Sequence, residues 1–296
     1  MKGTAWWAYA ACPAALLVLP AAMQTSEMDA FRAEASLYSA GPVSTGVREL
    51  NEIARLQVSE RRRAFRLGKI NTRLLHIDRD ATSHSHTVEI EAVSPCDADV
   101  AAFLREVASR RPSSAKERWS MPFDENDVSV ALWLSAGTHR VLLGADLKRH
   151  QDEQRGWGAV LGSPVRLNGQ AGVFKVAHHG AVNAQHSGVW STLLDEERIA
   201  VLTTWNRGRK LPRHDDVSRI LGLASQAYIT SGIGRRMRSR PKMVENKIRE
   251  RGAEIRGAGP RAGQIRLRLD LAARTPQWEV ALFDGAMRLQ EFSAST

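Results

Sequence analysis

The chain has 296 residues, of which 43% are hydrophobic and 25% are charged. This size and balance exclude a disordered chain and a multi-span membrane protein, and they allow a sizeable core without disulfide support. The two cysteines, Cys12 and Cys96, lack metal-type spacing and give no reason to expect an oxidising compartment, so we expect a cytoplasmic, enzyme-like protein.

The formal net charge of +10 raises the question of a polyanionic partner, because clustered Lys and Arg neutralise phosphates. Basic residues concentrate late in the chain, at Arg207, Arg209, Lys210 and Arg213, and again at Arg235, Arg236, Arg238, Arg240 and Lys242. The absence of interleaved aromatic residues favours a solvated face. Nucleic-acid contact through Arg235, Arg236, Arg238 and Arg240 is the alternative.

The amino terminus resembles a secretory signal, since Lys2 precedes an apolar stretch over residues 5–23. Pro13 and Pro20 interrupt that stretch, which is also marginal in length for a membrane span. A buried strand followed by a helix explains it equally well. We therefore expect no integral membrane association, and export with residues 1–23 as a signal peptide is the alternative to a cytoplasmic location.

Residues 26–109 show helix signals first and strand signals afterwards. The composition of residues 26–37 and 47–66 predicts helices, whereas the branched, alternating residues of 72–77 and 87–93 predict strands. A further helix is predicted after Asp97, a suitable N-cap, because apolar residues recur there at helical spacing. These residues are Val100, Phe103, Leu104 and Val107.

After a polar loop predicted at 110–126, strands alternate with helices. Strands are expected at 128–134, 140–143, 173–177, 199–203, 227–230, 264–271 and 278–283, and helices at 189–194 and 215–223. The first two strands form a predicted hairpin around Gly137. This alternation favours an α/β fold with helices packed outside a sheet. We expect one domain over residues 1–285 and a carboxyl-terminal tail at 286–296.

Candidate chemistry lies at the ends of two neighbouring predicted strands. The sequence Leu-Leu-Gly-Ala-Asp ends at Asp146, and Val-Phe-Lys-Val-Ala-His-His-Gly contains His178 and His179. Strand ends are common places for sites, and a carboxylate with imidazoles suits a metal ion such as zinc. Alternatively, Asp146 caps a turn and the histidine pair is a hydrogen-bonded core feature.

The order of these motifs resembles the carboxyl-terminal half of metallo-β-lactamase-fold hydrolases. It is most similar to the hydrolase-like domain of bacterial DNA-uptake channel proteins, with the pattern N-x-x-S, L-L-x-G-D and K-V-x-H-H-G-S. The match covers roughly residues 87–231. The resemblance implies a metallo-β-lactamase-like αββα sandwich and a hydrolase that uses one or two zinc ions.

Carried over by position, the resemblance assigns roles to individual residues. Asp146 corresponds to the metal-bridging aspartate and His178 to the late histidine ligand of the second metal, with His179 as the alternative for that role. Asn126 and Ser129 would order the loop beside the metal. Lys175 is either a site residue or a surface lysine, and the surface interpretation is favoured.

The chain also departs from the family pattern. The H-x-H-x-D-H motif of the first metal site has no match, and His84-Ser85-His86 lacks the Asp-His that should follow. Leu211 stands where the related Gly-His-Pro pattern places its histidine, so His214 is expected at the surface. Ala181 replaces the usual Ser after His-His-Gly.

Two hypotheses follow from these departures. The stretch over residues 15–20 with its following helix resembles an interior βα element, so the chain is expected to be an amino-terminally incomplete family member. If an upstream segment supplies the missing motif, metal-bound hydroxide would attack a substrate, and the basic late segment makes a phosphodiester attractive. If the motif is truly lost, the chain is an inactive family member that acts as a binding or scaffold protein.

Overall fold

The computed structural model describes residues 68–78, 87–109, 125–165, 167–206, 208–233, 242–251 and 261–295. The described chain is a mixed α/β protein, as predicted. It divides into two compact units, one of Met1–His178 with Val182–Asp195 and the other of His179–Ala181 with Glu196–Thr296. The elements predicted within residues 1–66, and the signal-like segment, lie outside the described residues. Within the described ranges, no helix has both the length and the apolar character needed to cross a membrane.

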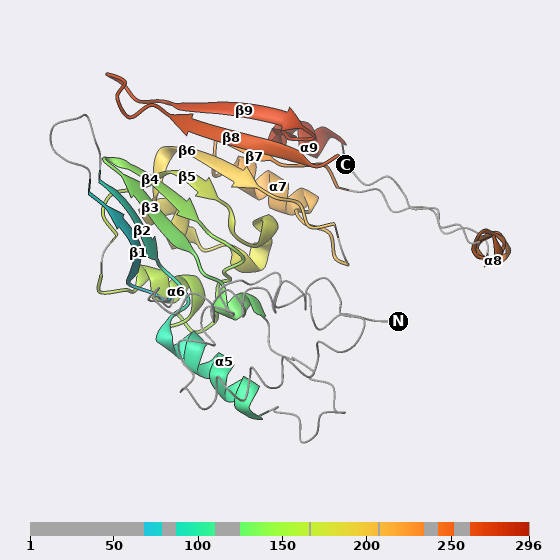
Figure 1. The fold of residues 1–296 in the computed structure, drawn as a ribbon, viewed down its shortest axis with the longest axis horizontal. Coiled ribbons are helices and arrows are strands. Elements are labelled where there is room, and N and C mark those ends of the chain that lie inside the picture. The colour runs from blue at the N-terminus through green and yellow to red at the C-terminus, as the bar shows by residue number, and fades with distance from the viewer. Residues whose placement is uncertain are drawn as a thin grey trace, which may run out of the picture. The chain divides into compact units, whose positions relative to one another are not determined.

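The first unit contains a sheet with the strand order β1-β2-β3-β4-β5 (Figure 1). The strands are β1 (Thr72–Ile77), β2 (Val88–Ala92), β3 (Leu132–Ala136), β4 (His139–Leu143) and β5 (Ala171–Lys175). The first three pairings are antiparallel, and β4 pairs with β5 in parallel. The predicted hairpin around Gly137 is confirmed, with Gly137 at a positive φ of 57°. Its first strand begins at Leu132 rather than at 128, because Glu125–Val128 forms a 3-10 turn, η2.

Short helices accompany these strands. They are α5 (Asp97–Ser109), α6 (Gly156–Leu161), the 3-10 turns η3 (Ala177–Gly180) and η4 (Val182–Ala184), and the π-helical turn η5 (Val189–Leu193). The helix predicted after Asp97 is confirmed, but Asp97 is its first residue, and its carboxylate pairs with Lys69 Nζ at 2.8 Å. The helix predicted at 189–194 is only the single turn η5.

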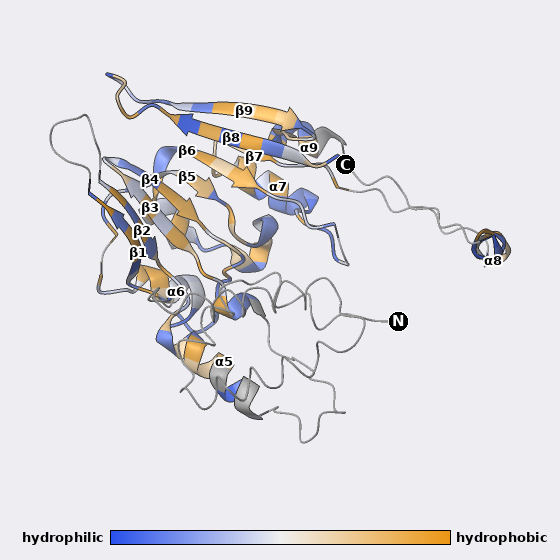
Figure 2. Ribbon diagram, viewed as in Figure 1, coloured by the Kyte–Doolittle hydropathy of each residue, from blue (hydrophilic) through white to orange (hydrophobic). Residues whose placement is uncertain are grey.

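The core of the first unit is an aromatic cluster on β5. Phe174 is 2% exposed and meets Trp157 and Trp190 edge-on, with ring centroids 6.3 and 5.2 Å apart. On the neighbouring strands, buried Trp133 stands opposite buried Leu142. Edge-to-face packing of aromatic rings adds to the stabilisation that burial of their apolar surface provides. Figure 2 shows the apolar residues concentrated on the strands.

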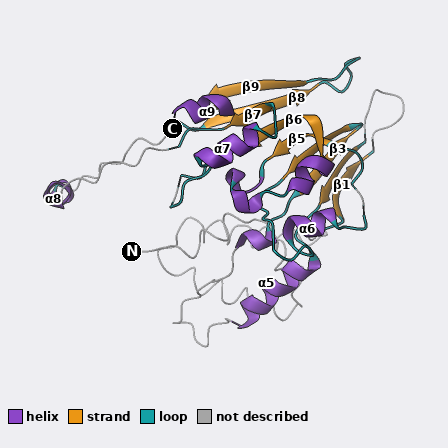
Figure 3. Ribbon diagram, turned by 180° about the vertical axis from the view of Figure 1, so that it is seen from behind, coloured by secondary structure: helices purple, strands orange, loops and turns teal. Residues whose placement is uncertain are grey.

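The second unit has its own strands and helices. Strand β6 (Leu194–Leu202) runs parallel to β7 (Gln226–Ile229), which pairs antiparallel with β10 (Met287–Arg288). Helices α7 (His214–Leu221) and α9 (Leu289–Ser295) pack on each other and on β7. A separate hairpin joins β8 (Gly263–Leu269) to β9 (Trp278–Asp284), as seen from behind in Figure 3. Helix α8 spans Lys242–Glu250.

The segment expected to be a tail is part of this second fold. Residues 287–295 form β10 and α9, and the side chains of Leu289 and Phe292 are buried. The segment predicted as a carboxyl-terminal tail at 286–296 is thus folded over residues 287–295. A two-residue strand carries too little sequence pattern to be recognised, although it is what brings α9 against β7.

The aromatic cluster yields a stability prediction. Replacing Phe174 with Ala should lower the free energy of unfolding by about 3–5 kcal/mol, because it removes a buried ring between two indoles. Phe283 is 39% exposed, so Phe283→Ala is the matched control and should cost less than about 1 kcal/mol. Chemical denaturation measures both values, and equal losses would contradict the packing described.

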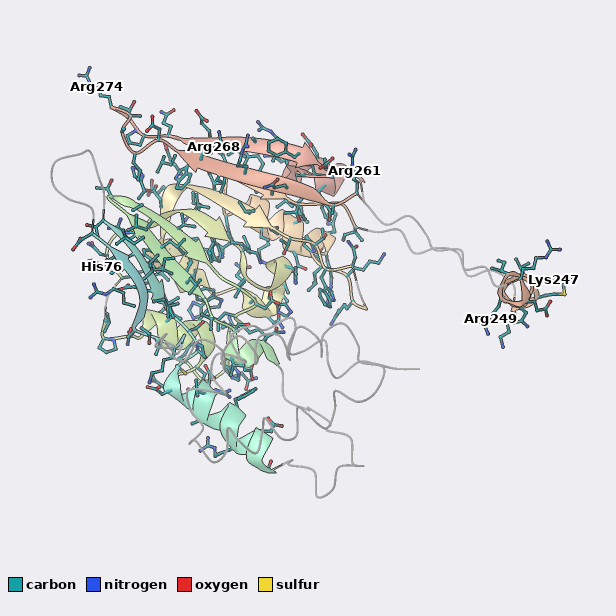
Figure 4. The ribbon with its side chains drawn as sticks, viewed as in Figure 1. His76, Lys247, Arg249, Arg261, Arg268 and Arg274 are labelled. Atoms are coloured by element: carbon teal, nitrogen blue, oxygen red, sulfur yellow. The ribbon has the colours of Figure 1, made fainter. Side chains whose placement is uncertain are left out.

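A second prediction concerns His76, an exposed residue on the edge strand β1 (Figure 4). The hydrogen bond to Glu89 at 2.8 Å and the contact with Asp78 at 3.2 Å raise its pKa above the ordinary value. A raised pKa in the folded state stabilises the fold below the unfolded-state pKa, and this contribution disappears as the pH rises through the folded-state value. An NMR titration should show that Glu89→Gln lowers the pKa of His76; an unchanged titration would refute this pairing.

Candidate active site

The parallel pairing of β4 and β5 places the two sequence motifs side by side. Leu143 pairs with Lys175 at the ends of the strands, and Gly144 donates its amide hydrogen to the Lys175 carbonyl at 2.9 Å. Beyond the strands, the His178 amide donates to the Ala145 carbonyl at 3.0 Å. The prediction that the two motifs end neighbouring strands is thus confirmed, and the backbones of Asp146 and His178 lie at one strand edge.

The backbone at this edge is strained. Ala145 and His178, which share that hydrogen bond, have φ values of 46° and 45°, in the left-handed region that favours glycine. Each such residue costs on the order of 1–3 kcal/mol, and such strain clusters at functional sites. A Cβ at Gly144 would lie 2.9 Å from the Lys175 carbonyl oxygen, so the close approach of the two chains requires glycine.

Lys175 belongs to this edge and is half-buried, so its side chain is partly removed from solvent. Its ammonium group donates to the Val176 carbonyl at 3.1 Å. Burial lowers the pKa of Lys175, and the negative charge of Asp146 opposes part of that change. The negative charge of Asp146 therefore acts on Lys175.

Asn126 and Ser129 lie on and just after the turn η2 in the same unit. Ser129 is buried, its amide donates to the Asn126 carbonyl at 3.2 Å, and its own carbonyl accepts the Ser94 hydroxyl at 2.6 Å. These contacts give Ser129 a structural part in ordering the turn. Asn126 is half-buried.

An ionic network that the sequence did not reveal connects η2 to the chain after Asp146. Asp127 forms an ion pair with Lys148, whose Nζ lies 2.9 Å from a carboxylate oxygen, and it lies 3.5 Å from His150 Nε2 and 3.7 Å from an Arg155 nitrogen. Arg155 Nε in turn donates to the buried Asp99 at 2.6 Å. This network fixes the loop that carries Asp146, and no short-range motif announces it because its members lie far apart in sequence.

Asp99 also sets the state of the described cysteine. Burial raises the pKa of the Cys96 thiol to about 11, and the thiol donates to the Asp99 carboxylate at 3.0 Å. The thiolate is the nucleophilic and metal-binding form of cysteine. Cys96 is consequently a protonated structural residue at neutral pH, in agreement with its lack of metal-type spacing.

In the second unit, His179 is oriented by Thr203. Its Nδ1 lies 3.1 Å from the Thr203 carbonyl oxygen and 3.0 Å from the hydroxyl of the same residue. A carbonyl only accepts, so Nδ1 donates in this contact, and the hydrogen bond fixes the orientation of the ring. The ring lies 5.5 Å from that of Trp205.

The turn after His179 is held by α7. Arg219 donates to the Gly180 carbonyl at 2.6 Å and to the carboxylate of buried Asp216 at 2.9 Å. Gly180 has a φ of 82°, and a Cβ there would lie 2.8 Å from Ile220 and 2.9 Å from Leu202. The glycine of the His-His-Gly motif is therefore required by both backbone conformation and packing.

The remaining predicted histidines do not add to these groups. His214 is the first residue of α7 and its side chain is 69% exposed, which confirms the expected surface position. His84 and His86 lie outside the described residues. Among the residues that are described, no group of three or more His, Cys, Asp or Glu side chains is arranged to hold a metal ion.

Comparisons with protein-family models, with curated proteins and with solved structures found no match. The resemblance to metallo-β-lactamase-fold hydrolases thus stays a prediction supported by the quoted motifs. Because folds host many unrelated activities, function has to be inferred from the residues of the site.

The His-His-Gly turn provides a test of its geometry. Gly180→Ala should lower the free energy of unfolding by about 2–4 kcal/mol, because it adds a steric clash to an unfavourable backbone conformation. Gly208 has a φ of 54° but open space around it, so Gly208→Ala carries the backbone cost alone, about 1 kcal/mol. Thermal and chemical denaturation compare the two variants; equal destabilisation would show that Gly180 is not tightly packed.

Proposed function

We propose that this chain is a metal-dependent hydrolase of the metallo-β-lactamase superfamily, with an αββα sandwich and a phosphodiester substrate. The observation that carries the proposal is the hydrogen bond between the β4 and β5 edges, from His178 to Ala145 at 3.0 Å, with both residues in strained conformations. Strained backbone beside a carboxylate and an imidazole is expected at a reactive site rather than at an ordinary turn.

Asp146 and His178 are the residues that would hold the metal ion, with His179 as the alternative imidazole. A bound zinc ion would supply a Lewis acid and lower the pKa of a coordinated water to about 7. Asn126 and Ser129 would order the neighbouring turn, through the η2 contacts and the Asp127 network. The Lys175 ammonium group would attract an anionic phosphodiester to this edge.

The described donors are of the right chemical type but are too few for a complete site. Zinc takes about three or four protein ligands, whereas the β4–β5 edge offers one carboxylate and one imidazole. A full site therefore needs further ligands from outside the described residues.

The alternative is an inactive member of the same superfamily that acts as a binding or scaffold protein. The observation that favours it is the absence of an H-x-H-x-D-H motif from the sequence. Such a protein would contact nucleic acid through Arg235, Arg236, Arg238 and Arg240, which lie outside the described residues. It predicts salt-sensitive polyanion binding without any dependence on metal.

Metal titration separates these functions. The unaltered chain should bind zinc or manganese in calorimetry, and Asp146→Asn or His178→Gln should weaken binding on the order of 100-fold by removing a ligand. His214→Gln is the matched control, because His214 is an exposed histidine that should not affect binding. Hydrolysis of bis(p-nitrophenyl) phosphate should decline in parallel.

Three results would decide against the hydrolase. The first is no metal binding by the unaltered chain, and the second is binding that is indifferent to Asp146 and His178. The third is stoichiometric metal without phosphodiester or ester hydrolysis. Each of them would favour the inactive binding protein.

A further inference from the structure

A basic loop of the second unit has an exposed tryptophan at its base. This Trp205 loop (residues 205–213) is closed by two backbone hydrogen bonds, from the Trp205 amide to the Leu211 carbonyl at 2.8 Å and from the Leu211 amide back at 3.0 Å. Leu211 is buried, whereas Trp205 is 39% exposed. The indole is thus presented to solvent on a fixed backbone.

The surroundings of Trp205 are ordered and polar. Its ring is tilted by 38° against the imidazole of His179, which Thr203 holds in place. Next to it, the hydroxyls of Thr204 and Ser231 lie 2.6 Å apart, and the Asn206 amide donates to Thr204 and to the Gly232 carbonyl, both at 3.4 Å. A flat apolar ring beside hydroxyl and amide groups suits a planar ligand with polar edges.

The charged residues of the loop are all positive. Four basic residues, Arg207, Arg209, Lys210 and Arg213, fall within residues 205–213, and no acidic residue occurs between 198 and 213. Arg209 and Arg213 are exposed, and no ion pair within the described part of the chain engages Arg209, Lys210 or Arg213. Trp205 lies two residues before Arg207 in the sequence, and its backbone bridge to Leu211 places it at the base of this basic loop.

Basic residues of the β8–β9 hairpin, in contrast, have partners within the hairpin. Arg261 pairs with Asp284 at 2.5 Å, and Arg268 stands opposite Glu279 in the strand register. Arg266 lies over the ring of Phe283, 4.8 Å from its centroid. Two arginines of the hairpin are therefore engaged by a carboxylate or an aromatic ring, whereas no ion pair among the described residues engages Arg209, Lys210 or Arg213.

We propose that the Trp205 loop binds single-stranded nucleic acid, with one base stacked on Trp205 and the backbone phosphates along Arg209, Lys210 and Arg213. Bases offer a sequence-independent flat face to an aromatic side chain, and a positive groove or loop follows the phosphates. A duplex hides these faces, so stacking selects the single strand. This interaction goes beyond the proposed hydrolysis, since it needs neither a metal ion nor cleavage.

Fluorescence anisotropy with labelled oligothymidylate and oligouridylate of about 15 nucleotides tests the stacking step. The measurements use the full chain in EDTA, so that failure of the hydrolase proposal leaves this test intact. Trp205→Ala should weaken binding about tenfold, and Trp205→Phe should retain most of the affinity because it keeps a ring. Phe283→Ala, which removes another 39% exposed aromatic residue, is the control and should leave binding unchanged. Comparing the two oligonucleotides shows whether DNA or RNA is preferred.

The salt dependence tests the phosphate contacts separately. Replacing Arg209 and Lys210 together with Ala should reduce the slope of log affinity against log salt by about 1.4, or about 0.7 for each lost contact, whereas Trp205→Ala should leave the slope unchanged. The matched control is the double variant Arg268→Ala and Arg274→Ala, which removes two positive charges from the β8–β9 hairpin. Figure 4 labels both arginines. This double variant should alter neither slope nor affinity by more than about twofold.

Four results would overturn the proposal. They are the absence of oligonucleotide binding, equal binding by Trp205→Ala in a folded state confirmed by circular dichroism, equal affinity for duplex DNA or heparin, and equal effects of the loop and hairpin charge variants. The last two would show attraction of a polyanion by net charge alone.

Discussion

The parallel pairing of β4 with β5 is the constraint on which the candidate active site depends. It sets Leu143 opposite Lys175, so the chain leaving each strand turns at the same edge. The two hydrogen bonds beyond the strands, into Lys175 and Ala145, follow from that register. Because side chains alternate between the faces of a sheet, a slip of one residue would reverse every inward side chain of β5, Phe174 included. The aromatic core therefore fixes the register, and the register fixes the site.

This dependence explains how strained residues persist at the edge. Ala145 and His178 adopt left-handed conformations that no local preference supports, so the surrounding structure must impose them. Phe174 anchors one strand between two indoles, and the Asp127 network restrains the loop on the other. In the second unit, His179 and Gly180 are held independently, by Thr203 and Arg219. His178 and His179 are adjacent in the sequence, but different partners hold them in place.

Sequence reasoning predicted the strands better than the parts between them. Strand β1 agrees with its predicted range to the residue, because alternating branched residues carry a strong pattern. Helix α6 was missed, since its Gly-Trp-Gly start has poor helix propensity. Lys175 was favoured as a surface lysine and is half-buried, because the burial of a strand-end lysine depends on tertiary packing. Trp205 is close to the basic residues in the sequence, but its bridge to Leu211 is visible only in the folded loop.

The two proposals rest on interactions that respond differently when one contact is removed. Metal coordination is short-ranged and needs a minimum number of ligands, so a chain that lacks one group of donors loses it almost completely. Binding of a polyanion sums over many charges and stacked rings, so each missing contact reduces affinity by a limited factor. A chain without the H-x-H-x-D-H motif could therefore still bind nucleic acid through the Trp205 loop even when hydrolysis is lost. The proposed stacking on Trp205 would therefore outlast the loss of a metal ligand, because backbone hydrogen bonds to Leu211 hold the base of that loop.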